Sequence, residues 1–327
     1  MNDEITLYDT TLRDGSQAEG ILFSVSDKLH IAEKLASFGI HYIEGGFPGS
    51  NVKDMEFFQS VRSMNWGKTK IAAFGSTRMP GSKVKEDASV NALLRAETPV
   101  VTFVGKASSQ QVTDVLQTTR DENLRMIEET ASYLSQNGRE VIYDAEHFFD
   151  GYLQDAEYTM SCLRSAVNGG VSHVVLCDTN GGRLPHEIEE ATRSVLAKLS
   201  CRVGIHTHND CGLAVANALA SLRAGAVQVQ GTINGYGERT GNCSLTTVIP
   251  LLEIKMGRTV LPSGRLADLT DLSHFVDEVA NQNHDPRAPF VGQSSFAHKG
   301  GMHANAVTKS TSSYEHIDPA SVGNRRR

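Results

Sequence analysis

The sequence predicts an α/β protein built as a closed (β/α)8 barrel of the TIM type, followed by a small C-terminal helical subdomain. Eight short apolar runs alternate with longer segments in which apolar residues recur at helical spacing. Polar residues follow the ends of the apolar runs, where a barrel places its chemistry. After the first run the chain has TTLRDGS, which lacks the G-x-G-x-x-G turn of the alternative, an open doubly wound sheet.

Strands are expected at the apolar runs and helices between them. The first helix is expected to start with a serine cap, to carry Leu29 and Leu35 on its apolar stripe, and to end at Gly39. Pro185 stands where a later helix opens. The predicted strands are 5–9, 42–45, 70–74, 100–104, 140–146, 173–178, 202–206 and 228–232, and the predicted helices are 26–38, 119–136, 156–168, 185–199, 213–224 and 245–256.

The barrel is expected to occupy residues 1–259, and residues 260–327 are expected to form the linker or lid subdomain. A helical pattern returns at 268–281, but the chain around 286–289 (PRAP) is irregular. The chain stops at 324–327 (NRRR) without a closing element. We therefore expect a fragment of a longer protein.

Composition and charge exclude several classes of protein. The chain has 31 basic and 38 acidic residues, and the resulting net charge of −7 argues against binding to nucleic acid or to an anionic membrane surface. No secretory signal is visible, and no segment approaches the roughly 20 apolar residues of a membrane helix. The five cysteines are scattered and never in C-x-x-C spacing, which favours a reduced, cytoplasmic protein over a disulfide framework.

His206 and His208 suggest a metal site. Residues two apart in a strand face the same side, so both imidazoles can bind one ion. Asp14, from across the barrel, is our choice for a third ligand, because three protein ligands leave positions open for a bidentate 2-oxo acid and a water. The alternative is a pair of rim histidines whose hydrogen bonds are satisfied by the protein.

Three neighbouring features remain open to two interpretations. Arg13 either stabilises a developing oxyanion beside the metal or forms an internal ion pair with Glu44 or Asp9. Glu146 is either a base (or the partner of one) or a helix cap. The glycine-rich segment 235–242 either binds an anion or only turns the chain.

Four segments together resemble the isopropylmalate, homocitrate and citramalate synthase family of metal-dependent barrels. They are 9–17 (DTTLRDGSQ), 206–210 (HTHND), 237–242 (GERTGN) and 300–303 (GGMH). The resemblance covers the barrel and the start of the subdomain. It implies an acyltransferase that condenses acetyl-CoA with a 2-oxo acid, one divalent metal ion (Mn, Mg, Zn or Co), and a homodimer.

The resemblance also implies roles for individual residues. It makes Asp14, His206 and His208 the metal ligands, with Asn242 close to the ion. Glu146 and His303 would together remove a proton from the acetyl-CoA methyl group, and in this family the histidine usually comes from the neighbouring subunit. The substrate-binding group would be Arg13 at the carbonyl oxygen, Thr179 at the carboxylate, and Gln17, Glu44 and Asp144 in support.

The choice of 2-oxo acid depends on a few positions. Homocitrate synthases bind a second carboxylate with an arginine on the strand of the general base, but here the positions that share the face of Glu146 are Ile142 and Asp144. The segments 44–51, 144–151 and 296–301 resemble the longer type of (R)-citramalate synthase, so we expect pyruvate as substrate. The resemblance to that type also implies that the chain is truncated before a C-terminal regulatory domain.

Other enzymes of the same barrel remain alternatives. The first is a 2-isopropylmalate synthase that uses 2-oxoisovalerate, since a few methyl groups change binding by only a few kcal/mol. A homocitrate synthase is less favoured. So is a lyase or aldolase such as the hydroxymethylglutaryl-CoA lyases, which use a cysteine in the loop after the eighth strand, where residues 235–241 have none.

Overall fold

A computed structural model describes residues 4–302, 309–310 and 313–327, and it confirms the predicted barrel. Each strand pairs in parallel with the next, and β8 closes the sheet by pairing with β1. All eight predicted strands are present within one or two residues of their expected bounds. The strands are β1 Thr6–Asp9, β2 Tyr42–Gly46, β3 Lys70–Ser76, β4 Val100–Lys106, β5 Glu140–Glu146, β6 His173–Asp178, β7 Arg202–Thr207 and β8 Gln228–Gly231.

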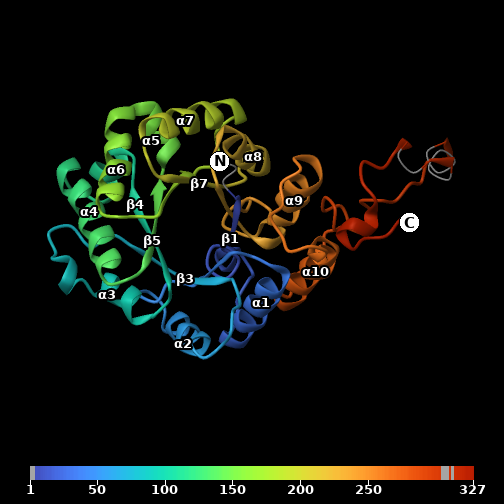
Figure 1. Cartoon of the computed structure of the whole chain (residues 1–327), viewed down its shortest axis with the longest axis horizontal. Helices are drawn as coiled ribbons and strands as arrows, with labels where there is room; N and C mark the ends of the chain where they lie inside the picture. Colours follow the sequence, from blue (N-terminus) through green and yellow to red (C-terminus); the bar gives the residue numbers. More distant parts are fainter. Residues whose placement is uncertain (1–3, 303–308, 311–312) are drawn as a thin grey trace.

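Helices surround the barrel (Figure 1). The six helices predicted for the barrel correspond to α1, α4, α6, α7, α8 and α9, whereas α2, α3 and α5 were not predicted. The α-helices are α1 Val25–Phe38, α2 Val52–Val61, α3 Ala88–Arg95, α4 Arg120–Gln136, α5 Phe148–Gln154, α6 Ala156–Asn168, α7 Pro185–Lys198, α8 Ala214–Ala224, α9 Leu245–Pro250 and α10 Leu269–Val279.

Among the six helices predicted for the barrel, five ends differ from the prediction, four of them by one residue and the end of α9 by six. Helix α1 begins at Val25, because Ser24 caps it: the Ser24 hydroxyl accepts from the Asp27 amide, and the Asp27 side chain accepts from the Ser24 amide. The helix expected at 245–256 is divided at Pro250, which has no amide hydrogen to donate. It continues as a π-helical turn, Leu251–Lys255.

The interior of the barrel is packed with side chains, so it is a core and not a channel. The rings of Tyr8 and Tyr42 stack with their centroids 5.6 Å apart. Around them lie further inward-facing side chains, Ala72, Val100, Ile142, Val175 and Cys177. This packing leaves the carboxyl-terminal rim as the place where a ligand can approach.

The residues after the barrel share its hydrophobic core. Helix α10 packs against α1, and its Leu269, Leu272 and Val276 belong to the same buried cluster as the outer faces of the strands. Thr270 donates a hydrogen bond to the carbonyl of Val322, in a short 3-10 helix near the end of the chain, at 2.7 Å. After α10 the chain extends away from the barrel (Figure 1).

No helix in the part of the chain that the structure describes is long and apolar enough to cross a membrane. The five cysteines all lie in that part, and all are free thiols. These findings agree with the expected absence of a disulfide framework.

Candidate metal centre

The structure brings Asp14, His206 and His208 together at the carboxyl-terminal rim. One ligand atom of each lies within 4.8 Å of the others, and all three side chains are buried. His206 Nε2 is 3.2 Å from Asp14 Oδ2 and 3.2 Å from His208 Nε2. His206 belongs to β7, His208 follows the strand directly, and Asp14 comes from the turn after β1.

A compact turn after β1 positions Asp14. The amides of Asp14 and Gly15 both donate to the carbonyl of Thr10. Asp9, at the end of the strand, accepts from the amide and the hydroxyl of Thr11 at 2.9 and 2.8 Å. Burial raises the pKa of Asp9 to about 7, although these hydrogen bonds oppose the shift.

The donor atoms fit a divalent metal ion. Two imidazole nitrogens face each other across 3.2 Å, and a carboxylate oxygen lies beside them. Asn242 adds an amide, whose Nδ2 is 2.8 Å from Asp14 Oδ2 and 3.3 Å from His206 Nε2. Its Oδ1 is buried and has no hydrogen-bond partner among the described residues. Two imidazoles and a carboxylate are a donor set typical of Zn, Mn or Co.

The electrostatic environment keeps Asp14 and His208 in ligating form, whereas at His206 burial favours a lower pKa but Asp14 outweighs it and raises the pKa. Burial favours a higher pKa for Asp14, but Arg13 and His206 outweigh it and hold the pKa well below its usual range. Burial and the neighbouring His206 lower the pKa of His208 to about 3, so this imidazole is neutral at physiological pH.

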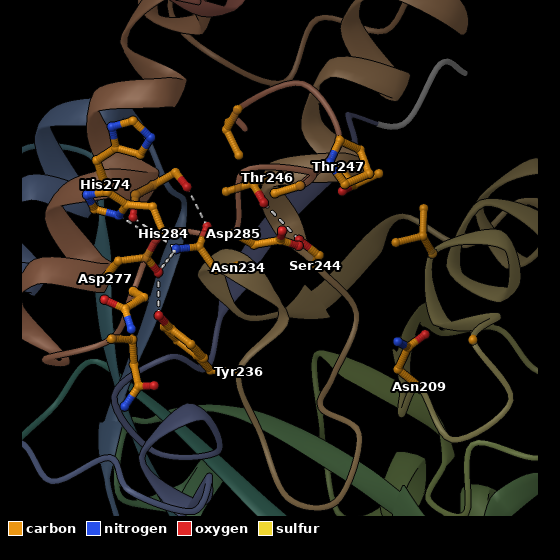
Figure 2. A pocket seen from close by; sticks show the side chains of 18 residues that line it. Asn209, Asn234, Tyr236, Ser244, Thr246, Thr247, His274, Asp277, His284 and Asp285 are labelled. Atoms are coloured by element: carbon orange, nitrogen blue, oxygen red, sulfur yellow. Dashed lines mark hydrogen bonds and ion pairs between the residues drawn. The ribbon is translucent and has the colours of Figure 1, made fainter. Parts of the chain in front are cut away.

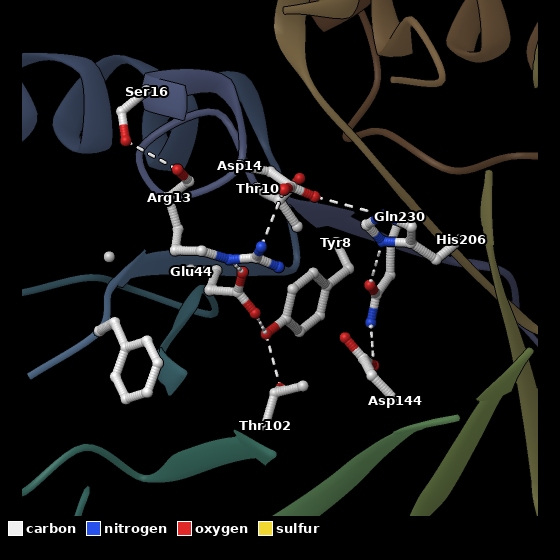
Figure 3. A network of polar contacts seen from close by, with 12 residues as sticks. Tyr8, Thr10, Arg13, Asp14, Ser16, Glu44, Thr102, Asp144, His206 and Gln230 are labelled. Carbon is white, nitrogen blue, oxygen red and sulfur yellow. Dashed lines mark hydrogen bonds and ion pairs between the residues drawn. The ribbon is translucent and has the colours of Figure 1, made fainter. Parts of the chain in front are cut away.

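Arg13 connects the metal position to the barrel interior (Figure 3). Its Nη1 donates to Asp14 Oδ1 at 2.8 Å, and its Nε donates to Glu44 Oε1 at 2.6 Å. The guanidinium carbon lies 3.8 Å from the centre of the Phe74 ring. The hydroxyl of Tyr8 donates to the other oxygen of Glu44 at 2.6 Å. The predicted ion pair of Arg13 is therefore with Glu44 and not with Asp9.

Glu146 forms an ion pair that was not predicted. Lys106 ends β4 in register with Glu146 at the end of β5, and its Nζ binds Glu146 Oε2. Both side chains are about one-fifth to one-quarter exposed, 19 % and 26 %. The next helix, α5, is capped by His147, whose φ is 55°, so the helix-cap interpretation of Glu146 is not supported.

Two further predicted residues, Thr179 and Gln17, differ in their contacts and exposure. Thr179 Oγ1 accepts from the amide of His147 at 2.8 Å. Gln17 is exposed, and with Arg13 it lines a pocket of about 610 Å³ whose walls include Phe47 and Phe74.

Asp144 is buried inside the barrel. Its Oδ1 accepts from Gln230 Nε2 at 3.0 Å, and burial together with nearby Glu44 raises its pKa to about 7. His303 lies outside the described residues. The roles assigned to these side chains remain predictions.

The glycine-rich segment 235–242 brings Asn242 to the centre. His208 and Asn242 form an isolated antiparallel bridge. A Cβ atom on Gly237 would overlap Asn242 Oδ1, so this close approach requires a glycine.

A second, polar pocket lies between this segment and α10 (Figure 2). It measures about 460 Å³, and none of the three candidate ligands lines it. Asp277 of α10 accepts from Asn234 Nδ2 at 2.5 Å, from the hydroxyl of Tyr236, and from His284 Nδ1 at 2.9 Å. This carboxylate therefore attaches the loop after β8 to α10.

Comparisons with known proteins give sequence matches along most of the chain. The HMGL-like family model matches residues 4–276, and the model "Homocitrate synthase post-HMGL domain-like" matches residues 290–327. Over its whole length the chain is 55% identical to an (R)-citramalate synthase from Aquifex aeolicus, of which it covers 62%. It is 35% identical to a probable 2-isopropylmalate synthase from Methanopyrus kandleri, of which it covers 63%. The chain thus spans about three fifths of the length of these relatives.

Solved structures show the same fold. An HMG-CoA lyase from Bacillus subtilis superimposes with a TM-score of 0.72, covering 86% of this chain and 95% of the lyase, at 17% identity. This likeness is one of architecture, the eight-stranded parallel barrel with its helices.

Proposed function

This chain belongs to the HMGL-like family, and from that premise we propose that it is the catalytic part of an acyltransferase that condenses acetyl-CoA with pyruvate to give (R)-citramalate. The observation that carries the proposal is the buried cluster of Asp14, His206 and His208, with the Arg13 guanidinium bound to one of its members. The 55% identity to an (R)-citramalate synthase supports pyruvate over the branched 2-oxo acid of a 2-isopropylmalate synthase, whose probable representative is 35% identical.

The metal and Arg13 would act on the 2-oxo acid. A divalent ion (Mn, Mg, Zn or Co) held by the three ligands beside Asn242 supplies a Lewis acid that polarises the ketone. Asp14 and Glu44 occupy two nitrogens of Arg13, and we expect the third, Nη2, to face the substrate oxygen. Burial opposes the charge of Arg13, but Asp14 and Glu44 raise its pKa, so it stays cationic and stabilises the oxyanion.

Glu146 would act on acetyl-CoA. With His303, which the family resemblance places on the neighbouring subunit of a homodimer, it would take a proton from the acetyl methyl group. The carbon that loses the proton then bonds to the carbonyl carbon of pyruvate, and the electron pair of the C=O bond moves to its oxygen. Water finally cleaves the thioester and releases CoA.

The proposal is tested by measuring CoA thiol release from acetyl-CoA with pyruvate, 2-oxoisovalerate or 2-oxoglutarate. We expect pyruvate to be preferred, a chelator to abolish the activity, and added Mn²⁺ to restore it. A strong preference for the branched acid would refute the choice of substrate.

The metal site has its own test, which does not depend on turnover. His208→Ala should lose bound metal, as measured by elemental analysis of the purified protein. Metal content equal to that of the wild type would eliminate the site.

A further inference from the structure

The two histidines of the metal centre are held differently. His206 Nδ1 lies 2.8 Å from Gln230 Oε1, and the two residues are direct partners across the β7–β8 pairing. His208 Nδ1 is also buried, but within the described part of the chain it has no hydrogen-bond partner. The protein therefore fixes the ring of one ligand through its second nitrogen and leaves the other ring without such a contact.

A neighbouring carboxylate determines which end of the Gln230 amide meets His206 (Figure 3). A carboxylate only accepts hydrogen bonds, and Asp144 Oδ1 is 3.0 Å from Gln230 Nε2. The amide must then direct its NH₂ group at Asp144 and its oxygen at His206. Asp144, His206 and Gln230 are 3%, 5% and 1% exposed, so solvent hardly competes for these contacts.

The orientation of the amide selects one tautomer of His206. An oxygen acceptor facing Nδ1 keeps a proton on Nδ1, so Nε2 is the nitrogen whose lone pair a metal ion would take. Nε2 is the nitrogen that faces Asp14 and His208. If the amide turned over, its NH₂ would face Nδ1 and favour the tautomer with a proton on Nε2, where the metal has to bind.

We propose that Asp144 and Gln230 form a relay that holds His206 in the metal-binding tautomer, so that both are positioning residues for the metal centre. The inference rests on the proposed metal site but not on the identity of the 2-oxo acid. Partners of this kind orient a ligand and raise its basicity, and their loss typically weakens metal binding 10–100-fold.

The relay is tested by measuring the affinity for Mn²⁺ or Zn²⁺ in competition with a chromophoric chelator. Gln230→Met keeps the size of the side chain but removes the acceptor, and we expect binding about 10–100-fold weaker than in the wild type. Gln228→Met is the matched control. Gln228 lies two residues earlier in β8 and is fully buried, and its amide has no partner among the described residues. We expect wild-type affinity in this variant.

Substitutions of Asp144 show whether metal binding depends on its hydrogen bond to Gln230 or only on the volume that its side chain fills. Asp144→Asn keeps an acceptor for the Gln230 NH₂ group and should bind metal within a few-fold of the wild type. Asp144→Leu frees the amide to turn over and should weaken binding. In Asp144→Leu/Gln230→Met the affinity should be no lower than in Gln230→Met alone, because Asp144 acts through Gln230.

A double variant that exchanges the amide of Gln230 and the carboxylate of Asp144 tests whether weaker metal binding in the other variants comes from misfolding. In Gln230→Glu/Asp144→Asn the new carboxylate accepts from His206 Nδ1, and the new amide donates to that carboxylate. This variant should retain metal binding within a few-fold. In the Zn²⁺-loaded protein, the ¹⁵N shifts of the His206 ring should show the proton on Nδ1 and the metal on Nε2.

Two results would overturn the relay. One is Zn²⁺ bound through Nδ1 of His206 in the wild type, and the other is a Gln230→Met variant that binds metal as tightly as Gln228→Met. If His208→Ala loses metal while Gln230→Met retains it, the relay fails and the proposed metal site stands. If His208→Ala also retains metal, the site itself fails.

Discussion

Glu146 is a partly exposed residue at the end of β5, where it pairs with Lys106 at the end of β4. The ammonium group holds one carboxylate oxygen of Glu146, and this contact restricts where the other oxygen can point. A base that must reach a methyl proton depends on such geometry before it depends on its pKa. Lys106 is therefore the residue whose removal should separate positioning from substrate binding.

We predict that Lys106→Met lowers kcat about tenfold and leaves KM for pyruvate almost unchanged, because the Glu146 carboxylate loses its fixed orientation. Steady-state kinetics of CoA release measure both constants. Lys83→Met is the control, because Lys83 and Glu86 form a pair that is 80% and 69% exposed. A Lys106→Met variant with wild-type kcat would show that the pair has no catalytic importance.

Asp9 makes the stability of the fold depend on pH. In the folded protein the pKa of Asp9 is about 7, above the ordinary value of 3.8 for an aspartate. The folded protein therefore holds this proton more tightly than the unfolded chain does. The free energy of unfolding that Asp9 contributes therefore falls as pH rises from about 4 to about 7. This difference in pKa corresponds to at most about 4 kcal/mol of unfolding free energy.

We predict that Asp9→Asn becomes more stable relative to the wild type as pH rises through this range. Urea denaturation gives the difference in unfolding free energy between Asp9→Asn and the wild type, once at pH 5 and once at pH 8. Asp114→Asn, at an exposed side chain, should show no such trend. A stability difference for Asp9→Asn that is the same at both pH values would contradict the assignment.

The sequence predicted the cluster of candidate ligands, Asp14, His206 and His208, because each position depends on local rules. The spacing of His206 and His208 in a strand places them on one side, and Asp14 follows a strand end, where a barrel collects polar groups. Lys106 and Gln230 were not predicted, because their roles depend on which residues of neighbouring strands are in register. The sequence of a single strand does not contain that information.

At the scale of elements, a buried ion pair joins α1, β2 and α2. Lys28 Nζ of α1 donates to the carbonyl of Gly45 at 2.9 Å and to Asp54 Oδ1 of α2 at 2.5 Å. Asp54 Oδ2 in turn accepts from the amide of Phe47 at 2.8 Å. These contacts fix the chain directly after Glu44, which binds Arg13.

We predict that Lys28→Met destabilises the protein by about 3–5 kcal/mol, because it leaves the Asp54 carboxylate buried without its cation. Chemical denaturation measures the loss, and Lys28→Met/Asp54→Asn should recover part of it. Lys34→Met, on the same helix, is the control, because its pair with Asp271 is 34% and 71% exposed and should contribute about 1 kcal/mol or less. Equal losses in Lys28→Met and Lys34→Met would show that burial of the pair is unimportant.

The sequence predicted the strands more completely than the helices. Parallel strands buried on both faces appear as apolar runs, and all eight were found. Helices α2, α3 and α5 were missed because they are only 10, 8 and 7 residues long. So few turns show little periodicity, and their helical state depends on packing against the barrel.

At the scale of the whole molecule, the barrel and α10 pack into one hydrophobic core. Leu269, Leu272 and Val276 complete the core on the side of α1, and Asp277 holds the loop after β8. The subdomain predicted to begin at residue 260 therefore shares buried side chains with the barrel, and its bounds remain a prediction. An independent domain would have buried these side chains against its own residues.

We predict that the chain 1–327 unfolds in a single calorimetric transition, and that the chain 1–259 lacks a cooperative transition because its core is open where α10 packed. Calorimetry and near-ultraviolet circular dichroism of both chains check this. Two separate transitions in the longer chain, or a native spectrum for the shorter one, would establish residues 260–327 as an independent unit.

Gly237 shows how a residue with no functional group can limit what a catalytic loop tolerates. One added methyl group at this position would collide with the amide oxygen of Asn242 and move it away from the metal position. Libraries that diversify residues 235–241 to alter substrate choice should therefore keep residue 237 as glycine. Alanine there would displace the Asn242 amide from its contacts with Asp14 and His206 before any new specificity could be selected.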